Sequence, residues 1–502
     1  MNVHQSGIPV LIVAGPLFAA FLLPLVGWWR RAWAFPIAIA ALSLSFGASV
    51  VTAQRVLSTG PVHYFMGGWT PPWGIEFRID PLGALMLLLL SSITLLIAIY
   101  SKHSILKELP DREGPFYSVY LLLVSGLTGI VATADMFNMY VFLEISSLTS
   151  YALIALGGGA AVVSSFRYVI LGTVGAAFYL LAVGYLYSVT GSLNMADLAQ
   201  ILPALYETNA VRVGFGFLVI GLAIKMALFP MHAWLPGAYS DAPSAVSALI
   251  AATTTKVAAY ALVRVMFFVF EPRFSIELIP VTALLSWMGA IAMILGSVMA
   301  IAQTDLKRML AYSSVAQIGY IVLGIGLANA DGLTGGLLHL VNHAVMKGCL
   351  FLVAGAIVYR TGVRDIRGLR NLSAKMPWTA GAFTISAFSM IGIPPTAGFF
   401  SKLYLILGAA KSEHWVFLGI ILFSSVLALV YFVNVIRYMY FPSPAADADT
   451  APPPLDPTRD EAPLTMLVPT TILAAAVVLL GVFNGEIVSR FIDTVIPASF
   501  AR

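Results

Sequence analysis

The chain has 502 residues, of which 60% are hydrophobic and only 10% are charged, with a formal net charge of +4. A soluble domain carries about 25% charged residues, so the composition argues against a soluble protein and indicates an integral membrane protein. The basic residues are spread over short loops instead of one face, which argues against a nucleic-acid-binding protein.

Apolar stretches of about 20 residues recur along the whole chain, and each matches roughly 30 Å of hydrocarbon at 1.5 Å per residue. We therefore predict an all-α polytopic membrane protein with about fourteen transmembrane helices. The predicted spans are 8–28, 34–52, 82–100, 116–134, 137–157, 165–188, 212–232, 242–269, 280–302, 306–327, 332–358, 377–408, 415–440 and 463–484. The first is interpreted as a helix and not as a signal peptide, because Arg30 and Arg31 follow it instead of preceding it.

These helices are predicted to form five parts. Residues 60–80, with GGW, two prolines and WGIEFRID, indicate an ordered hairpin on the outer side between helices 2 and 3. The stretch PSPAADADTAPPPLDPTRDEAP is too polar and Pro-rich to be helical and is expected to be mobile. The predicted parts are 1–115 with helices 1–3 and the hairpin, 116–270 and 280–440 as two five-helix repeats, 441–462 as a mobile cytoplasmic loop, and 463–502 with helix 14 and a C-terminal tail.

Orientation is predicted from the Lys and Arg residues outside the spans, since cytoplasmic loops carry the excess of them. Fifteen of these residues fall on one predicted side and seven on the other. The asymmetry places both termini outside a bacterial cytoplasmic membrane. The one cysteine, Cys349, excludes an intramolecular disulfide and is interpreted as a packing residue.

Ionisable residues inside the spans are few, and a charge buried in a bilayer is costly and usually functional. Glu144 is the one clearly intramembrane carboxylate, and Lys225 and Lys256 lie near the middles of two other segments. We hypothesise that Glu144 holds Lys225 charged when close, and that Lys225 passes its proton toward Lys256 when the pairing weakens. The alternative is a static ion pair that fixes helix packing. The hydroxyls of Thr253–Thr255 are candidates for the path, although threonine in membrane helices more often bonds its own backbone.

Two spans carry interruptions, at Pro230 in helix 7 and at Pro394 and Pro395 in helix 12. Each proline removes a backbone donor and frees carbonyls inside the membrane. Lys225 and Lys402 lie within about two turns of these breaks. Discontinuous helices in corresponding positions indicate an inverted repeat with ion sites at the breaks, and we assign helices 4–8 and 9–13 to its two units.

Helix 11 contains HLVNHAVMKGCLF, in which His339, His343 and Lys347 are spaced by four and share one stripe of the helix. Imidazoles there are predicted to relay protons toward Lys402. Histidines that are simply hydrogen-bonded within the bundle are the alternative. A metal site is not predicted, because no carboxylate or cysteine completes the set at a fitting spacing.

Four further polar residues receive structural interpretations. Asp135 in TADMFN is expected to cap a helix in a solvated turn near the outer interface. Arg264 is expected to reach the outer interface with its long side chain. Lys307 and Arg308 are expected to anchor the inner end of helix 10.

Several of these motifs together resemble one family over residues 60–440. The chain resembles the antiporter-like subunits shared by respiratory complex I, membrane-bound hydrogenases and Mrp-type multisubunit Na+/H+ antiporters. The motifs are FLEISSLTSYAL, KMALFPMHAWLPGAYSDAPSAVSALI, TKVAAYALVRV, DLKRMLAYSSVAQIGY, HLVNHAVMKGCLF and GIPPTAGFFSKL. Within the family, GGWTPPWGIEFRIDPLGALM and TGSLNMADLA look most like the D-type component of Mrp antiporters.

The resemblance implies fourteen helices in two inverted units, with Glu144 and Lys225 as the modulating pair, Lys256 as central relay and Lys402 as terminal proton site. It implies a transporter subunit without cofactor or metal, with other subunits of a complex, H+ and Na+ as partners. The alternatives are a proton-pumping subunit of a redox complex and a quinone-binding enzyme subunit. One departure from the family is Gln317, where many relatives have histidine, which makes a relay through helix 10 doubtful.

Overall fold

The long apolar segments form helices whose ends coincide with capping residues, glycines and prolines. The computed structural model describes residues 7–441 and 455–500. Its helices are α1 (Ile8–Trp29), α2 (Ala34–Thr59), α3 (Pro81–Glu108), α4 (Glu113–Ala132), α5 (Met136–Ala155), α6 (Ala160–Thr190), α7 (Met195–Ile201), α8 (Asn209–Lys225), α9 (Leu235–Asp241), α10 (Ser244–Arg264), α11 (Val281–Ile301), α12 (Leu306–Gly326), α13 (Ala330–Thr361), α14 (Leu372–Lys375), α15 (Pro377–Ile391), α16 (Ala397–Lys411), α17 (Trp415–Tyr440), α18 (Leu464–Val482) and α19 (Asn484–Ile487). The prediction of an all-α polytopic membrane protein is confirmed.

Helix occupies each of the fourteen predicted spans. Eleven helical segments of the described chain are long and apolar enough to cross a membrane on their own. In the seventh predicted span, 212–232, helix α8 ends at Lys225 and α9 begins only after the span, whereas the twelfth span is divided into α15 and α16. The breaks expected at the prolines are therefore present.

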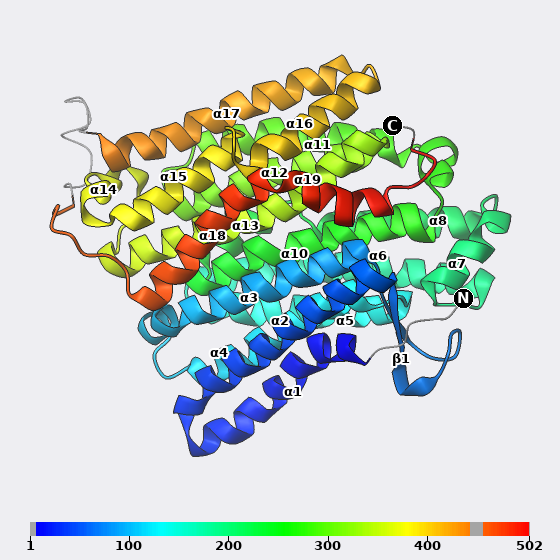
Figure 1. Ribbon diagram of the computed structural model, residues 1–502, viewed down its shortest axis with the longest axis horizontal. Coiled ribbons are helices and arrows are strands. Elements are labelled where there is room, and N and C mark those ends of the chain that lie inside the picture. The colour runs from blue at the N-terminus through cyan, green and yellow to red at the C-terminus, as the bar shows by residue number, and fades with distance from the viewer. Residues whose placement is uncertain (1–6, 442–454, 501–502) are drawn as a thin grey trace.

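One hairpin interrupts the helical pattern. Strands β1 (Val62–Phe65) and β2 (Glu76–Ile79) pair antiparallel, with Val62 opposite Ile79. The hairpin predicted for residues 60–80 is confirmed, and it lies at the same end of the bundle as both ends of the described chain (Figure 1). We call this end the hairpin side.

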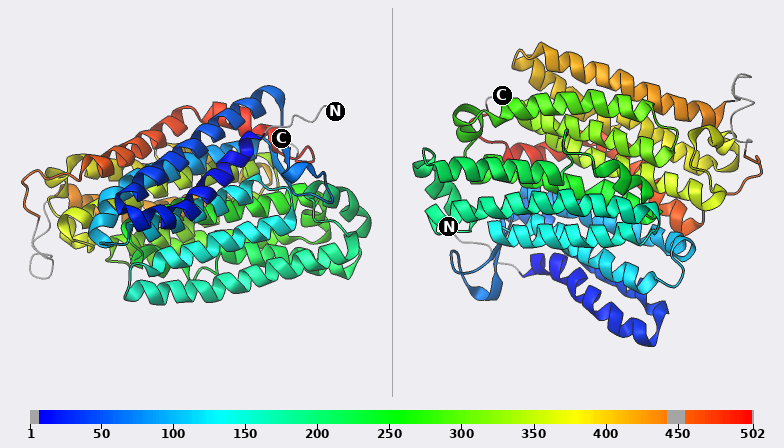
Figure 2. Two further views of the ribbon diagram at one scale, coloured as in Figure 1. Left: turned by 90° about the horizontal axis from the view of Figure 1, so that it is seen from below. Right: turned by 180° about the vertical axis from the view of Figure 1, so that it is seen from behind.

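Burial divides the helices into a centre and a rim. Every residue of α10 is buried, and most of α12 and α13 is buried as well. In contrast, α1, α6 and α17 expose large apolar side chains such as Phe18, Phe166 and Phe423. Figure 2 shows these outer helices along the edges of the bundle. Buried central helices surrounded by helices with exposed apolar side chains are the arrangement that a lipid environment requires.

Two short β-bridges mark the same position in two helical units. Asp135 bridges Asn194 in the first unit, and Asp305 bridges Asp365 in the second. Each of the four is a helix N-cap whose side chain accepts a hydrogen bond from the turn that follows. The long helix between the bridged residues has 31 residues in α6 and 32 in α13. The two units thus repeat one construction.

The two bridges lie at opposite ends of α10. At its start, Arg364 donates to the carbonyl of Ser240 and to the carboxylate of Asp305. At its other end, the Tyr260 hydroxyl donates to the carbonyl of Val131, close to the first bridge. Opposite placement of matching elements is the geometry of an inverted repeat. The unit boundaries, 116–270 and 280–440, remain a prediction.

The segment predicted as a mobile loop is only partly described, because residues 442–454 lie outside the described residues. Residues 455–462 are held against the chain that follows α13. Leu455 N–H donates to the Arg370 carbonyl, and the Glu461 carboxylate accepts from the backbone N–H of Trp378. This part of the loop is therefore anchored, because its carboxylate satisfies the free N–H groups at the start of α15.

Candidate functional site

A buried ion pair lies where the first broken helix stops. Lys225 is the last residue of α8, and its Nζ lies 3.3 Å from Oε1 of Glu144 on α5. It also donates to the Ser147 hydroxyl at 2.6 Å. Only 5% of the Lys225 side chain is exposed, compared with 26% of the Glu144 side chain. The contact expected between the two residues is present, and its role in proton transfer remains a prediction.

A small cavity adjoins this pair. It has a volume of about 20 Å³ and lies between α4, α5, α6, α8 and α10, and its walls include Lys225, Ser147 and Thr254. A cavity of this size is large enough for about one water molecule, and its polar walls can hydrogen-bond that molecule. The cavity thus extends the surroundings of Lys225 toward α10, the helix that carries Lys256. We refer to it as the Lys225 cavity.

Lys256 is buried on α10 and has no carboxylate partner among the described residues. Its ammonium donates to the carbonyl of Ala251 and lies 3.4 Å from the Thr255 hydroxyl. Thr253 and Thr254, by contrast, donate to carbonyls one turn back in their own helix. The backbone-bonding alternative therefore applies to these two threonines, and Thr255 is the hydroxyl in reach of Lys256.

The two histidines of α13 lie in one buried stripe, with ring centroids 6.1 Å apart. His339 contacts Ser401 Oγ through Nδ1 at 2.9 Å and Gln317 Oε1 through Nε2 at 2.8 Å. Neither ring nitrogen of His343 has a hydrogen-bond partner among the described residues. The described residues contain no group of three or more His, Cys, Asp or Glu side chains that could hold a metal ion.

Gln317, the departure expected to weaken a path through the tenth predicted helix, directly contacts the relay histidine. Because the amide oxygen accepts, Nε2 of His339 carries the proton in this pairing. The Ser401 hydroxyl lies 2.9 Å from Nδ1 and also bonds the Gly398 carbonyl at 3.1 Å. The Gln317 amide thus bonds the His339 ring instead of breaking the chain of polar groups.

Lys402 lies beyond the second break, on α16. Its ammonium donates to the carbonyls of Met390 and Ile391, both at 2.9 Å, and to Ser425 Oγ at 3.1 Å. These carbonyls end α15, so the lysine satisfies acceptors that the break leaves without helical partners. Ser401, next to Lys402 in the chain, bonds His339 and so connects the two predicted relay sites.

A fourth buried lysine, Lys347, donates to the Leu310 carbonyl at 2.7 Å and to the Ser313 hydroxyl at 2.5 Å. Of the four lysines Lys225, Lys256, Lys347 and Lys402, Lys225 alone contacts a carboxylate within the described ranges. The other three ammonium groups are held by neutral acceptors, an arrangement that is costly inside a membrane and typical of functional sites.

Two of the basic residues have partners beyond those expected from the sequence. Lys307 lies in the first turn of α12, where it is buried and donates to the Ala242 carbonyl at 3.2 Å. Arg264 lies at the hairpin side, where its Nη1 is 2.6 Å from Oδ2 of Asp80 and its Nε donates to the Tyr260 hydroxyl. In both cases the long side chain finds a partner on another element, which sequence spacing does not reveal.

Asp135 does cap a helix, since its carboxylate accepts from Asn138 N–H at 2.7 Å. It is buried, however, and does not lie in a solvated turn. Sequence reasoning missed the serine and tyrosine partners of the lysines. Ser147 follows Glu144 by three residues and so faces the same side of α5, which is a signal that sequence spacing contains. Ser425 and Tyr320 join Lys402 from distant segments without any local signal.

A polytopic bundle with broken helices and a row of buried lysines defines an antiporter-type membrane subunit. Comparison with known proteins agrees: the family described as "NADH:quinone oxidoreductase/Mrp antiporter, TM" matches residues 133–428. The chain belongs to this family of membrane subunits.

The similar proteins include subunits of redox complexes and subunits of antiporters. The chain is 47% identical over 98% of both lengths to the N subunit of the NADH-quinone oxidoreductase of Desulforudis audaxviator. It is 34% identical to the D subunit of the Na(+)/H(+) antiporter of Alkalihalophilus pseudofirmus, over 78% of this chain and 79% of that one. A chain of an archaeal membrane-bound sulfane sulfur reductase superposes with a TM-score of 0.89 and 30% identity, covering 98% of this chain and 99% of that chain.

Proposed function

We propose that the chain translocates protons as one subunit of a multisubunit membrane complex, through Glu144, Lys225, Lys256, the two histidines of α13 and Lys402. The observation that carries this proposal is the Glu144–Lys225 contact at the break of α8. A buried lysine with one movable counter-charge has two states, charged when the carboxylate is close and neutral when it is withdrawn.

The proposed relay continues from this pair through buried groups on α10, α13 and α16. The Lys225 cavity reaches α10, the helix that carries Lys256, and α10 packs against α13, on which His343 is buried. From His339 the contacts run through Ser401 to Lys402. Hydroxyls, imidazoles and single waters are the carriers that such a path uses.

The sidedness of the membrane follows from the loops. Several basic loops contact one another at the end of the bundle opposite the hairpin. Arg31 pairs with Asp111, Lys107 donates to the Tyr359 carbonyl, and Arg360 pairs with Asp460. We infer that this basic end faces the cytoplasm and that the hairpin and both termini face outward. The membrane is then the bacterial cytoplasmic membrane.

The energy source has two candidates. A redox-driven complex is favoured by the 47% identity over nearly full length to a component of an NADH-quinone oxidoreductase. A gradient-driven Na+/H+ antiporter is favoured by the resemblance to the antiporter protein of Alkalihalophilus pseudofirmus, which covers 78% of the chain. In both, this chain is a transporter subunit that works together with partner subunits.

Reconstitution tests the two candidates. The affinity-purified native complex is placed in liposomes, and Na+-dependent proton movement is measured under an imposed pH gradient without NADH or quinone, together with iron-sulfur and flavin content. Movement without a redox substrate identifies the antiporter. Absence of movement, with iron-sulfur proteins present and pumping restored by an electron donor and acceptor, identifies the redox complex.

A further inference from the structure

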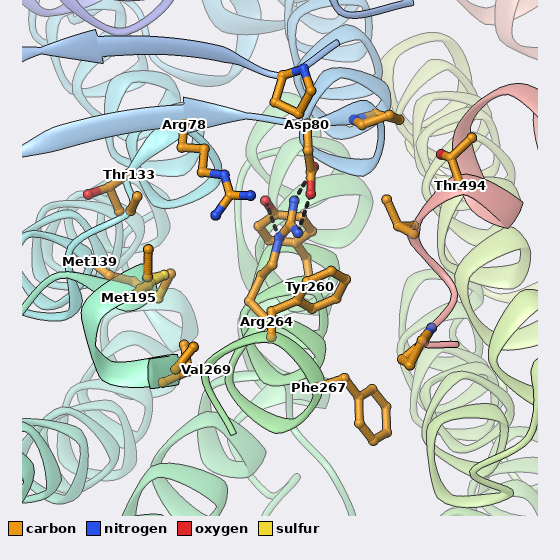
Figure 3. A pocket seen from close by; sticks show the side chains of 18 of the residues that line it. Arg78, Asp80, Thr133, Met139, Met195, Tyr260, Arg264, Phe267, Val269 and Thr494 are labelled. Carbon is orange, nitrogen blue, oxygen red and sulfur yellow. Dashed lines mark hydrogen bonds and ion pairs between the residues drawn. The ribbon is translucent and has the colours of Figure 1, made fainter. Parts of the chain in front are cut away.

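Two cavities lie in line along the seam between α4 and α10. The larger, of about 650 Å³, opens on the hairpin side and is lined by Thr133 at the end of α4 and by Tyr260 and Arg264 of α10. Figure 3 shows Arg78 and Arg264 around Asp80 in this cavity. The smaller is the Lys225 cavity, whose walls include Ile130 of α4.

The two cavities are separated by about one helical turn. On α4 their walls are Ile130 and Thr133, and on α10 they are Ala258 and Tyr260. Three residues of helix rise about 4.5 Å, so one layer of side chains stands between the hairpin-side cavity and the surroundings of Lys225.

A hydrogen-bonded chain fills this layer. The Tyr260 hydroxyl donates to the Val131 carbonyl at 3.2 Å and accepts from Arg264 Nε at 2.9 Å. Both outer nitrogens of the Arg264 guanidinium bond the two oxygens of Asp80, with Nη1 and Oδ2 2.6 Å apart. Asp80 in turn caps α3 by accepting from Gly83 N–H at 2.9 Å. This chain of hydrogen bonds therefore connects three helices, α3, α4 and α10.

We propose that Tyr260, Arg264 and Asp80 form a gate, closed in this structure, on a water path from the hairpin side to the Glu144–Lys225 pair. The inference rests on the proposed function and adds a second access to its central pair. When the Asp80–Arg264 pair separates, the side chains in this layer move apart. Water then fills the one helical turn between the two cavities and links them.

The other interpretation of the same contacts is a purely structural ion pair, which we call a pin, that holds α3 against α10. The two differ in what happens to the space beneath Tyr260 when the ion pair is weakened. A gate predicts access from the hairpin side to residues lining the Lys225 cavity. A pin predicts a less stable protein without that access.

Cysteine labelling in the assembled complex distinguishes them. Cys349 is the only cysteine and is buried, so its replacement by Ala provides a cysteine-free background. Into it, Thr254→Cys or Ala258→Cys is introduced, since both residues line the Lys225 cavity. Thr494→Cys, exposed in the hairpin-side cavity, reports which membrane side a membrane-impermeant anionic methanethiosulfonate reaches.

The gate is then opened by substitution. Asp80→Asn keeps the α3 cap, because asparagine caps as well as aspartate, and removes the charge that holds Arg264. We expect labelling of the cavity cysteines from the side that labels Thr494→Cys to become at least about tenfold faster, as the loss of a charged hydrogen bond allows. Tyr260→Phe is expected to act in the same direction.

The proposal is overturned if neither substitution accelerates labelling from the hairpin side, or if labelling accelerates only from the opposite side. Proton transport of each parent complex is measured in parallel. Retained transport with unchanged labelling rejects the gate while leaving the proposed function in place, so the two failures are distinguishable.

Discussion

Glu144 and Lys225 lie 3.3 Å apart but are unequally buried, with 26% of the glutamate side chain and 5% of the lysine side chain exposed. The carboxylate therefore has an open side toward which it can move, whereas the ammonium is enclosed. Withdrawal of the carboxylate favours deprotonation of the lysine. This difference in exposure assigns a separate role to each residue: the glutamate moves, and the lysine gains or loses its proton.

The second acceptor of Lys225 is expected to tune this switch. Ser147→Ala removes a 2.6 Å hydrogen bond to the ammonium, and a hydrogen bond to a charged group contributes up to about 3 kcal/mol. Proton transport by the reconstituted complex should fall about tenfold. Ser150→Ala is the matched control, since that hydroxyl bonds the Ser146 carbonyl of its own helix and does not line the Lys225 cavity, and its transport should stay near the parent rate.

Lys402→Ala is expected to lower proton transport by at least about a hundredfold while the complex still assembles, because the variant loses the group that exchanges the proton. Lys411→Ala on the same helix is the control, since Lys411 is 55% exposed and pairs with Asp331 near the surface. If the complex no longer assembles with Lys402→Ala, the lysine has a structural role as the cap of α15.

Gln317→Leu tests whether the amide fixes the tautomer of His339. Loss of the 2.8 Å contact to Nε2 leaves the buried ring free to adopt the other tautomer, and transport should fall about fivefold. Ser314→Ala on the same helix is the control, because its hydroxyl bonds the Leu310 carbonyl one turn back. Equal rates in both variants would show that Gln317 only packs.

The hairpin provides a pH-dependent contribution to stability outside the membrane spans. Burial alone favours the neutral acid of Glu76, but hydrogen bonds from His63 and Asn194 outweigh it and lower the pKa of Glu76 below its usual 4.5. A carboxyl group with a lowered folded pKa stabilises the protein above its unfolded pKa, and this stability is lost as the pH falls through the folded value.

Glu76→Gln should therefore lower the melting temperature at neutral pH. The difference from the parent should shrink once the pH falls below about 4.5, where the parent carboxyl also becomes protonated. Thermal unfolding followed by fluorescence between pH 3 and pH 8 measures it. A difference that stays constant over this range would show that the charge of Glu76 contributes nothing to the stability of the hairpin.

The helices could be predicted because the signal for them is local. Apolar runs of about 20 residues indicated all fourteen spans, and Pro230 and Pro394 marked both breaks. The stripe of His339 and His343 also follows from spacing alone. Partners from distant segments could not be predicted in this way. The Arg264–Asp80 pair joins residues 184 positions apart, and the Gln317–His339 contact depends on how α12 packs on α13.

Coupling between Glu144 and Lys225 is the central claim, and a double-mutant cycle in reconstituted complexes tests it most directly. Proton transport is measured for Glu144→Gln, Lys225→Ala and the double variant at equal protein content. The account predicts that each single change removes most transport and that the double variant is scarcely slower than either. Losses that add on a logarithmic scale would contradict the account, because they would mean that the two residues act independently.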